Sequence, residues 1–217
     1  MPRLSSFYLF TYNSLQAFGW AISLYRILVS LALTNSLNTA YASAGDSVCL
    51  LQTISFLEVI HGALGIVRTG VLLPLMQWGG RIHFLLAIVR GIGEVQDSPL
   101  VFVIFAAWSL SEVIRYSHYA LTCIGKCPYW VTSLRYTAFI FLYPVGVAGE
   151  MWLMYHALPR MKLKNLYADY FAFLPFSYYN FIEVLLVVYP ILWLKLYLHL
   201  LKQRHSKLGK QHDKKNK

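Results

Sequence analysis

Six long runs of apolar residues dominate this sequence, and each is near the ~20 residues that a helix needs to cross a bilayer. We expect transmembrane segments at 12–33, 48–67, 71–89, 100–119, 136–158 and 181–201. Only 13% of the residues are charged, and no polar stretch is long enough to bury its own core. Because backbone groups in lipid must bond internally, the sequence predicts an all-α, six-helix membrane bundle forming one domain over residues 1–217.

The basic residues predict how this bundle is oriented. Six spans place both termini on one side of the membrane, and the basic tail, 202–217, predicts that this side is the cytosol. One loop conflicts with this rule, because Arg160, Lys162 and Lys164 then fall on the lumenal side. A count of five or seven spans would also remove the conflict.

The last four residues, Lys214-Lys215-Asn216-Lys217, have the spacing of a dilysine retrieval signal. Such a signal is read in the cytosol and indicates the endoplasmic reticulum membrane, whereas a generic basic tail is the alternative interpretation. The net charge of +10 does not by itself indicate a nucleic-acid partner, because lysine and arginine are common beside anionic lipid. We therefore expect no nucleic acid.

Charged residues within the apolar segments are candidates for function, because an ionised side chain at mid-membrane costs ~2.5–3.5 kcal/mol. They are Glu58, His61, Arg90, Glu94, Glu112, Arg115, Arg135, Glu150, Glu183 and Lys195. Glu112 and Arg115 are three residues apart on one helical face. Two interpretations of this spacing stay open: a neutralising ion pair, or a polar cavity where Arg115 or Arg135 meets an anionic ligand.

The fifth segment contains a second pair, Tyr143 and Glu150, which are seven residues apart and so share one face of a helix. Their Cα atoms are expected ~10 Å apart, a gap that suits two groups flanking a substrate. Pro144 removes one helical hydrogen bond, while Gly146 and Gly149 let another helix or a ligand come close. A kinked packing helix with a snorkelling glutamate is the alternative.

A phenol and a carboxylate facing an apolar substrate can together remove a proton alpha to a carbonyl and protonate a departing hydroxyl. That reaction is a dehydration, and it needs neither a metal nor a redox cofactor. Other chemistries lack their motifs: there are no desaturase-type histidine boxes, no complete dinucleotide fingerprint, no GxSxG elbow and no phosphatase-type cysteine–arginine spacing.

At these residues the chain resembles the very-long-chain (3R)-3-hydroxyacyl-CoA dehydratases, also called protein tyrosine phosphatase-like proteins, including the plant PASTICCINO-type members. The specific blocks are "LEVIHGALGIVR" (57–68), "WSLSEVIRYSHYAL" (108–121) and "LRYTAFIFLYPVGVAGE" (134–150). The resemblance implies a six-span enzyme of the endoplasmic reticulum that dehydrates 3-hydroxyacyl-CoA to trans-2-enoyl-CoA in fatty-acid elongation. It implies no cofactor, and it implies the condensing enzyme and two reductases of the cycle as partners.

The family's catalytic pair is the tyrosine of an LYPxG motif and the glutamate seven residues later, which are Tyr143 and Glu150 here. The resemblance also implies substrate-binding or supporting roles for Arg81, Glu112, Arg115, Tyr116 and Arg135. One of the basic residues, Arg115 or Arg135, is expected to hold the CoA phosphates near the cytosolic face.

One block departs from the family pattern, because Gly79-Gly80 stands where a pair ending in serine usually precedes the arginine. This change is expected to alter substrate preference or weaken a polar contact. Two other functions remain as alternatives to the enzyme: a non-catalytic membrane scaffold or phosphoprotein-binding regulator, and a transporter. A transporter would be expected to show an inverted repeat, and none is visible.

Overall fold

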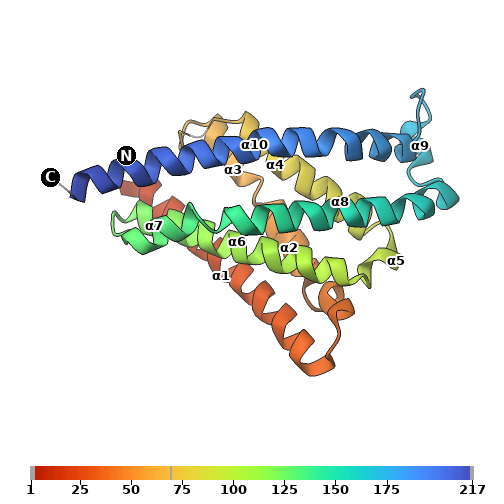
Figure 1. Ribbon diagram of the computed structural model, residues 1–217, viewed down its shortest axis with the longest axis horizontal. Helices are drawn as coiled ribbons and strands as arrows, with labels where there is room; N and C mark the ends of the chain where they lie inside the picture. Colours follow the sequence, from red (N-terminus) through yellow and green to blue (C-terminus); the bar gives the residue numbers. More distant parts are fainter. Residues whose placement is uncertain (1–2, 69, 216–217) are drawn as a thin grey trace.

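The computed structural model describes residues 3–68 and 70–215, and in them the chain forms only helices joined by turns and short loops (Figure 1). Asn216 and Lys217, the last half of the expected retrieval signal, lie outside the described residues. Six described stretches are long and apolar enough to cross a membrane: Leu4–Thr34, Leu37–Ala63, Leu72–Val89, Pro99–Cys123, Tyr129–Lys164 and Tyr178–Ser206. The protein is therefore an all-α, multi-pass membrane protein, as its sequence predicts.

The first third of the chain makes one antiparallel pair of helices. Its elements are α1 (Arg3–Thr34), the 3-10 turn η1 (Leu37–Thr39), α2 (Ala40–Ile54) and α3 (Leu57–Ala63). The helix expected from residue 12 begins at Arg3, and two polar residues within it face inward. Asn13 and Gln16 are both buried, and their side-chain amides donate to the carbonyls of Leu9 and Leu51.

The middle third carries the chain across the membrane and back. Its elements are α4 (Leu72–His83), the π-helix η2 (Phe84–Val89), α5 (Gly93–Gln96) and α6 (Pro99–Cys123). The start of α6 is encoded locally: Ser98 caps it by accepting a hydrogen bond from the amide of Leu100, and Pro99 occupies its first turn.

The last third makes a second antiparallel pair. Its elements are α7 (Tyr129–Arg135), α8 (Phe139–Lys164), α9 (Ala168–Phe171) and α10 (Tyr178–Lys215). Asn165 ends α8 in the left-handed conformation, with a φ of 44°, which is a common way to stop a helix.

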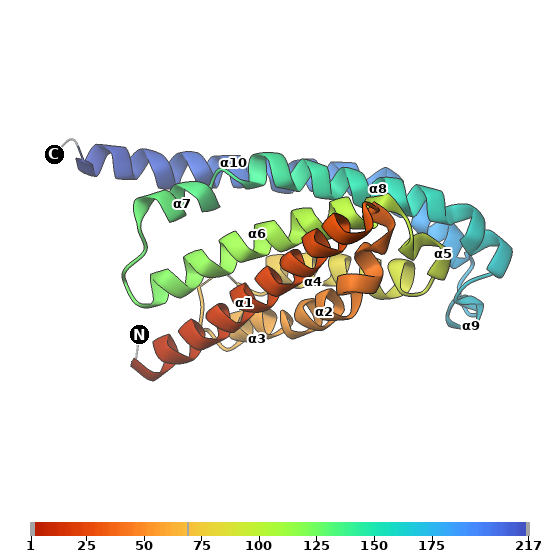
Figure 2. The ribbon, with the colours of Figure 1, turned by 90° about the horizontal axis from the view of Figure 1, so that it is seen from below.

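The helix α6 lies at the centre of the bundle, packed between α1 on one side and α8 on the other (Figure 2). The helix α2 packs against α1 and α6, and α10 packs against α8. The N- and C-terminal ends of the described chain lie at the same end of the bundle, which we call the terminal end (Figure 1). The short helices α5 and α9 lie at the opposite, distal end.

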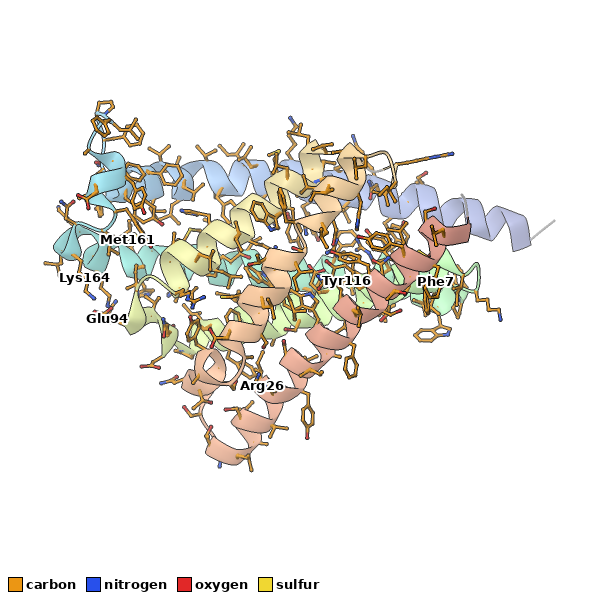
Figure 3. All side chains as sticks on the ribbon, turned by 180° about the vertical axis from the view of Figure 1, so that it is seen from behind. Phe7, Arg26, Glu94, Tyr116, Met161 and Lys164 are labelled. Atoms are coloured by element: carbon orange, nitrogen blue, oxygen red, sulfur yellow. The ribbon has the colours of Figure 1, made fainter. Side chains whose placement is uncertain are left out.

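The basic residues that conflicted with the orientation rule lie at the distal end, as the six-span arrangement requires. Lys164 donates a hydrogen bond to Oε1 of Glu94 at 2.5 Å, and Figure 3 shows both far from Phe7 at the terminal end. This hydrogen bond holds the pKa of the Glu94 carboxyl below its usual range. Nζ of Lys162 lies 5.5 Å from the ring centroid of Tyr179, and the guanidinium of Arg160 donates a hydrogen bond to the backbone carbonyl of His156. The positive charge at this end is thus partly engaged within the protein.

Candidate active site

A chain of four charged side chains crosses the interior between α3, α4 and α6. Arg115 donates two hydrogen bonds to Glu58, at 2.6 and 2.9 Å, and a third to Glu112 at 2.6 Å. The other oxygen of Glu112 pairs with Arg81. The two arginines and two glutamates balance in charge, so the ion-pair interpretation of Glu112 and Arg115 is confirmed.

Aromatic rings complete this charged network. The hydroxyl of Tyr116, which is fully buried, donates to Glu58, and the Arg115 guanidinium lies 4.3 Å from the Tyr116 ring centroid. Figure 3 shows Tyr116 inside the bundle. Arg81 lies 4.6 Å from the ring centroid of Trp108, and through that ring the network reaches the neighbouring helix α8.

Glu150 lies on α8 with only 4% of its surface exposed, and both of its oxygens accept a hydrogen bond. The indole nitrogen of Trp108 donates to Oε1 at 2.9 Å, and the hydroxyl of Tyr189 donates to Oε2 at 2.5 Å. The two donors come from α6 and α10, on either side of α8. The carboxylate is therefore held in one orientation inside the bundle.

Tyr143 lies on the same helix as Glu150, toward the terminal end. Its ring centroid is 6.1 Å from that of Trp193 and 6.3 Å from that of Tyr197, both on α10. Within the described chain, no residue accepts a hydrogen bond from its hydroxyl. The phenol is thus held by its ring, and its hydroxyl remains available to a substrate.

Pro144 ties this region to α10 rather than breaking the helix. It has no amide hydrogen, so the carbonyl of Ile140, four residues earlier, loses its helical partner. The hydroxyl of Tyr197 donates to that carbonyl at 3.3 Å. The proline therefore helps to fix α10 beside Tyr143 while α8 continues through it.

Two glycines bring α8 against α6 beside Glu150. A Cβ atom at Gly149 would lie 2.8 Å from Cγ1 of Ile104, a distance that forces a shift, whereas one at Gly146 would lie 3.6 Å from Trp108. The close approach at Gly149 brings the indole of Trp108 within hydrogen-bonding distance of Glu150.

A cavity of about 210 Å³ lies between α4, η2, α8 and α10, with Glu150 in its wall. The other lining residues are Gly79, Gly80, His83, Phe84, Met154, Phe181, Leu185 and Tyr189. Most of this lining is apolar; Glu150 and Tyr189 lie together at one end, and His83 is the other polar side chain among the lining residues. A second, much smaller cavity of about 20 Å³ lies along the charged network and includes Glu58, Arg81, Glu112, Arg115 and Tyr116 in its lining.

The structure brings together most of the residues that the sequence singled out. Arg81, Glu112, Arg115 and Tyr116 belong to the charged network, which reaches Glu150 through Trp108. Tyr143 packs instead against α10. Arg135, at the end of α7, is outside the hydrogen-bonded network but borders it through Tyr119. The guanidinium of Arg135 lies 5.9 Å from the Tyr119 ring centroid, and that of Arg115 lies 5.7 Å from the same centroid.

Sequence reasoning did not identify the two donors to Glu150, Trp108 and Tyr189. Trp108 falls within the quoted block 108–121, but a tryptophan in an apolar segment reads as core. Tyr189 lies in the apolar helix α10, and no charged or polar residue at helical spacing from it indicates a role in a site.

The fold and this site define a membrane-embedded helical bundle in which a fixed carboxylate lines an apolar cavity and a phenol lies two turns earlier on the same helix, an arrangement suited to acid–base chemistry. Comparison with known proteins gives the family. A family model described as "Protein tyrosine phosphatase-like protein, PTPLA" matches residues 52–210, and the chain belongs to this family.

Relatives with curated names match most of the chain. "Very-long-chain (3R)-3-hydroxyacyl-CoA dehydratase 2" of Homo sapiens is 34% identical over 95% of this chain and 82% of its own length. The dehydratase 1 of Ovis aries is 33% identical over 94% of this chain and 72% of its own length. The "Very-long-chain (3R)-3-hydroxyacyl-CoA dehydratase PASTICCINO 2A" of Oryza sativa subsp. japonica is 37% identical over 74% of this chain and 72% of its own length. No solved structure matches the chain.

Proposed function

We propose that this chain converts very-long-chain (3R)-3-hydroxyacyl-CoA to trans-2-enoyl-CoA, with Tyr143 and Glu150 as its catalytic residues. The observation that carries the proposal is a buried carboxylate, fixed by two donors, on the same helix as a phenol whose hydroxyl faces no acceptor in the described chain. The enzyme is a hydro-lyase, as the names of its relatives indicate. The scaffold function is not favoured.

Glu150 is suited to take the proton from C2 of the substrate. Trp108 and Tyr189 each donate to one of its oxygens, so the carboxylate is an acceptor in a defined orientation. Removing the C2 proton moves charge onto the thioester oxygen. The guanidinium of Arg81 lies 4.6 Å from the ring centroid of Trp108, which itself donates to Glu150, and we propose that the positive charge of Arg81 stabilises the thioester oxygen.

Tyr143 is suited to protonate the leaving hydroxyl at C3. The C2–H bond breaks as Glu150 takes its proton, the C2–C3 double bond forms, and the C3–O bond breaks. The hydroxyl leaves with the phenolic proton as water. Transfer of a proton from Glu150 back to Tyr143 restores both groups, so the reaction balances without an external oxidant or reductant.

The remaining predicted residues divide into two roles. Arg115 donates to two carboxylates and so is engaged within the network, where it holds Glu58 and Glu112 in place. Arg135 has no ion-pair partner among the described residues and lies near the terminal end of the bundle. We therefore assign the CoA phosphates to Arg135, with Arg81, Glu112, Arg115 and Tyr116 supporting the catalytic pair.

The proposed setting is the endoplasmic reticulum membrane with both termini in the cytosol. The excess of lysine and arginine after the last apolar segment supports the cytosolic side for the C-terminal region. Its proposed partners are the condensing enzyme and the two reductases of the elongation cycle, because these supply the hydroxyacyl substrate and consume the enoyl product.

The test is a direct assay of the purified protein in detergent. Conversion of a very-long-chain 3-hydroxyacyl-CoA is compared for the parent and the variants Tyr143→Phe and Glu150→Gln, with Tyr155→Phe and Glu183→Gln as matched controls on exposed positions of α8 and α10. Removing a general acid or base is expected to lower kcat by roughly 10²- to 10⁴-fold. The controls should keep the parent rate.

Two outcomes would contradict the proposal in different ways. A folded parent that converts no substrate of any chain length would favour the scaffold. Full activity in both Tyr143→Phe and Glu150→Gln would agree with the proposed reaction but would show that these two residues do not catalyse it.

A further inference from the structure

The apolar cavity beside Glu150 is large enough to hold part of a hydrocarbon chain. Its volume is about 210 Å³, whereas an apolar cavity of about 150 Å³ in another protein takes up benzene. Leu185, Met154 and Phe181 contribute apolar surface to it. The chemistry of the lining therefore selects a saturated chain rather than a polar ligand.

The cavity extends from Glu150 in one direction only, away from Tyr143. Met154 lies one turn beyond Glu150 toward the distal end of α8. Phe181 lies on the distal side of Tyr189 on α10, about 12 Å along an ideal helix. Tyr143 lies on the opposite side of Glu150, toward the terminal end and Arg135.

The distal limit of the cavity is a contact between two of its walls. Nε2 of His83 and the hydroxyl of Tyr178 are hydrogen-bonded at 3.1 Å, and the ring of Phe181 stands edge-on to His83 with centroids 5.7 Å apart. These residues join the end of α4 to the start of α10. A chain that entered past Glu150 would run along the cavity toward this contact.

One wall of the cavity is bare backbone. Gly79 and Gly80 both line it, and a Cβ atom built on either glycine would meet nothing within 4 Å. Two successive glycines weaken a helix, each by ~1 kcal/mol relative to alanine. No close approach of another helix accounts for them, because the space beside them is open. The absence of side chains at Gly79 and Gly80 therefore makes the cavity wider.

We infer that the acyl chain of the substrate occupies this cavity, and that Gly79 and Gly80 set how bulky and how long a chain it accepts. The inference rests on the proposed function and deepens it. The thioester lies at the terminal end, C2 and C3 lie between Tyr143 and Glu150, and the chain continues past Glu150 along the glycine wall. Filling that wall with side chains shortens the accepted chain without touching the catalytic residues.

The experiment measures chain-length preference in Gly79→Leu and Gly80→Leu. Gly93→Leu is the matched control, because Gly93 also has open space around a Cβ atom and lies outside the cavity. The ratio of kcat/KM for a very-long-chain to that for a medium-chain 3-hydroxyacyl-CoA should fall roughly 10- to 200-fold in the cavity variants, as expected when a hydrophobic pocket loses room for substrate carbon. The control should keep the parent ratio.

A second readout separates this inference from the proposed function. Equilibrium binding of saturated acyl-CoA of the same two lengths needs no turnover, and the cavity variants should weaken binding of the longer chain selectively. Leucine forms helices better than glycine, so thermal stability should not fall. An unchanged ratio and unchanged binding in both leucine variants would overturn the inference, whereas a parent that binds long acyl-CoA but does not dehydrate would overturn the proposed function alone.

Discussion

Replacing Gly149 by alanine would disturb the contact that brings α6 against α8. The added methyl group would lie 2.8 Å from Cγ1 and 3.5 Å from Cδ1 of Ile104, so either that side chain or the helix must move. Overpacking of this kind costs ~1–3 kcal/mol, and the better helix propensity of alanine offsets ~1 kcal/mol of it. We expect a net loss of up to about 2 kcal/mol in the free energy of unfolding.

The same change should reduce activity, although residue 149 does not face the cavity. Ile104 and Trp108 lie on successive turns of α6, so a shift at Ile104 reaches the indole that donates to Glu150 at 2.9 Å. A hydrogen bond to a charged group contributes ~1.5–3 kcal/mol. If this hydrogen bond stabilises the transition state by that amount, its loss raises the activation free energy equally and lowers kcat roughly 10- to 150-fold.

Gly146→Ala is the matched control for this prediction. It makes the same chemical change one turn away on the same helix, but its methyl group would lie 3.6 Å from the Trp108 ring, in ordinary contact. It should therefore be neutral or slightly stabilising, with kcat near that of the parent. Thermal unfolding in detergent and steady-state assays of both variants provide the measurement. If Gly149→Ala matched Gly146→Ala in both, the account of this interface would be wrong.

Three further predictions concern single contacts of the site. Tyr189→Phe removes one donor to Glu150 and should lower kcat roughly 10- to 150-fold in steady-state assays. Because one oxygen of the buried Glu150 carboxyl then lacks a partner, thermal unfolding should also show a loss of ~1–3 kcal/mol in stability. Arg135→Gln should raise KM for acyl-CoA and leave kcat nearly unchanged; an equal effect on a pantetheine thioester, which lacks the nucleotide phosphates, would contradict the assignment. Arg115→Leu leaves the carboxylates of Glu58 and Glu112 without this partner and should destabilise the protein by ~3–5 kcal/mol. Lys195→Leu, at an exposed position, should not destabilise it. Similar melting temperatures for the two variants would refute a structural role for the network.

The charged network illustrates how far sequence spacing reaches. Glu112 and Arg115 are neighbours on one helix, so their pairing was open to prediction from a three-residue spacing. The partners that complete the network, Glu58 and Arg81, come from α3 and α4, and no local pattern indicates them. The prediction therefore identified an ion pair and missed that it is the centre of a larger structure.

The first helix shows the opposite limit. The expected segment starts at residue 12 and contains Asn13 and Gln16, whereas the helix begins at Arg3. Hydropathy counts residue types and not directions, so buried amides such as Asn13 look like interruptions when they are bonded inside the bundle.

The sequence by itself determined the six apolar helices, their number and the shared helical face of Tyr143 and Glu150. These are local properties, because hydrogen bonding within each segment and the 3.6-residue period fix them without reference to other helices. The tertiary structure alone decided which donors hold Glu150, which ring Arg135 contacts, and the cavity beside Gly79 and Gly80. These features join residues from different helices, and their distances depend on how the helices pack.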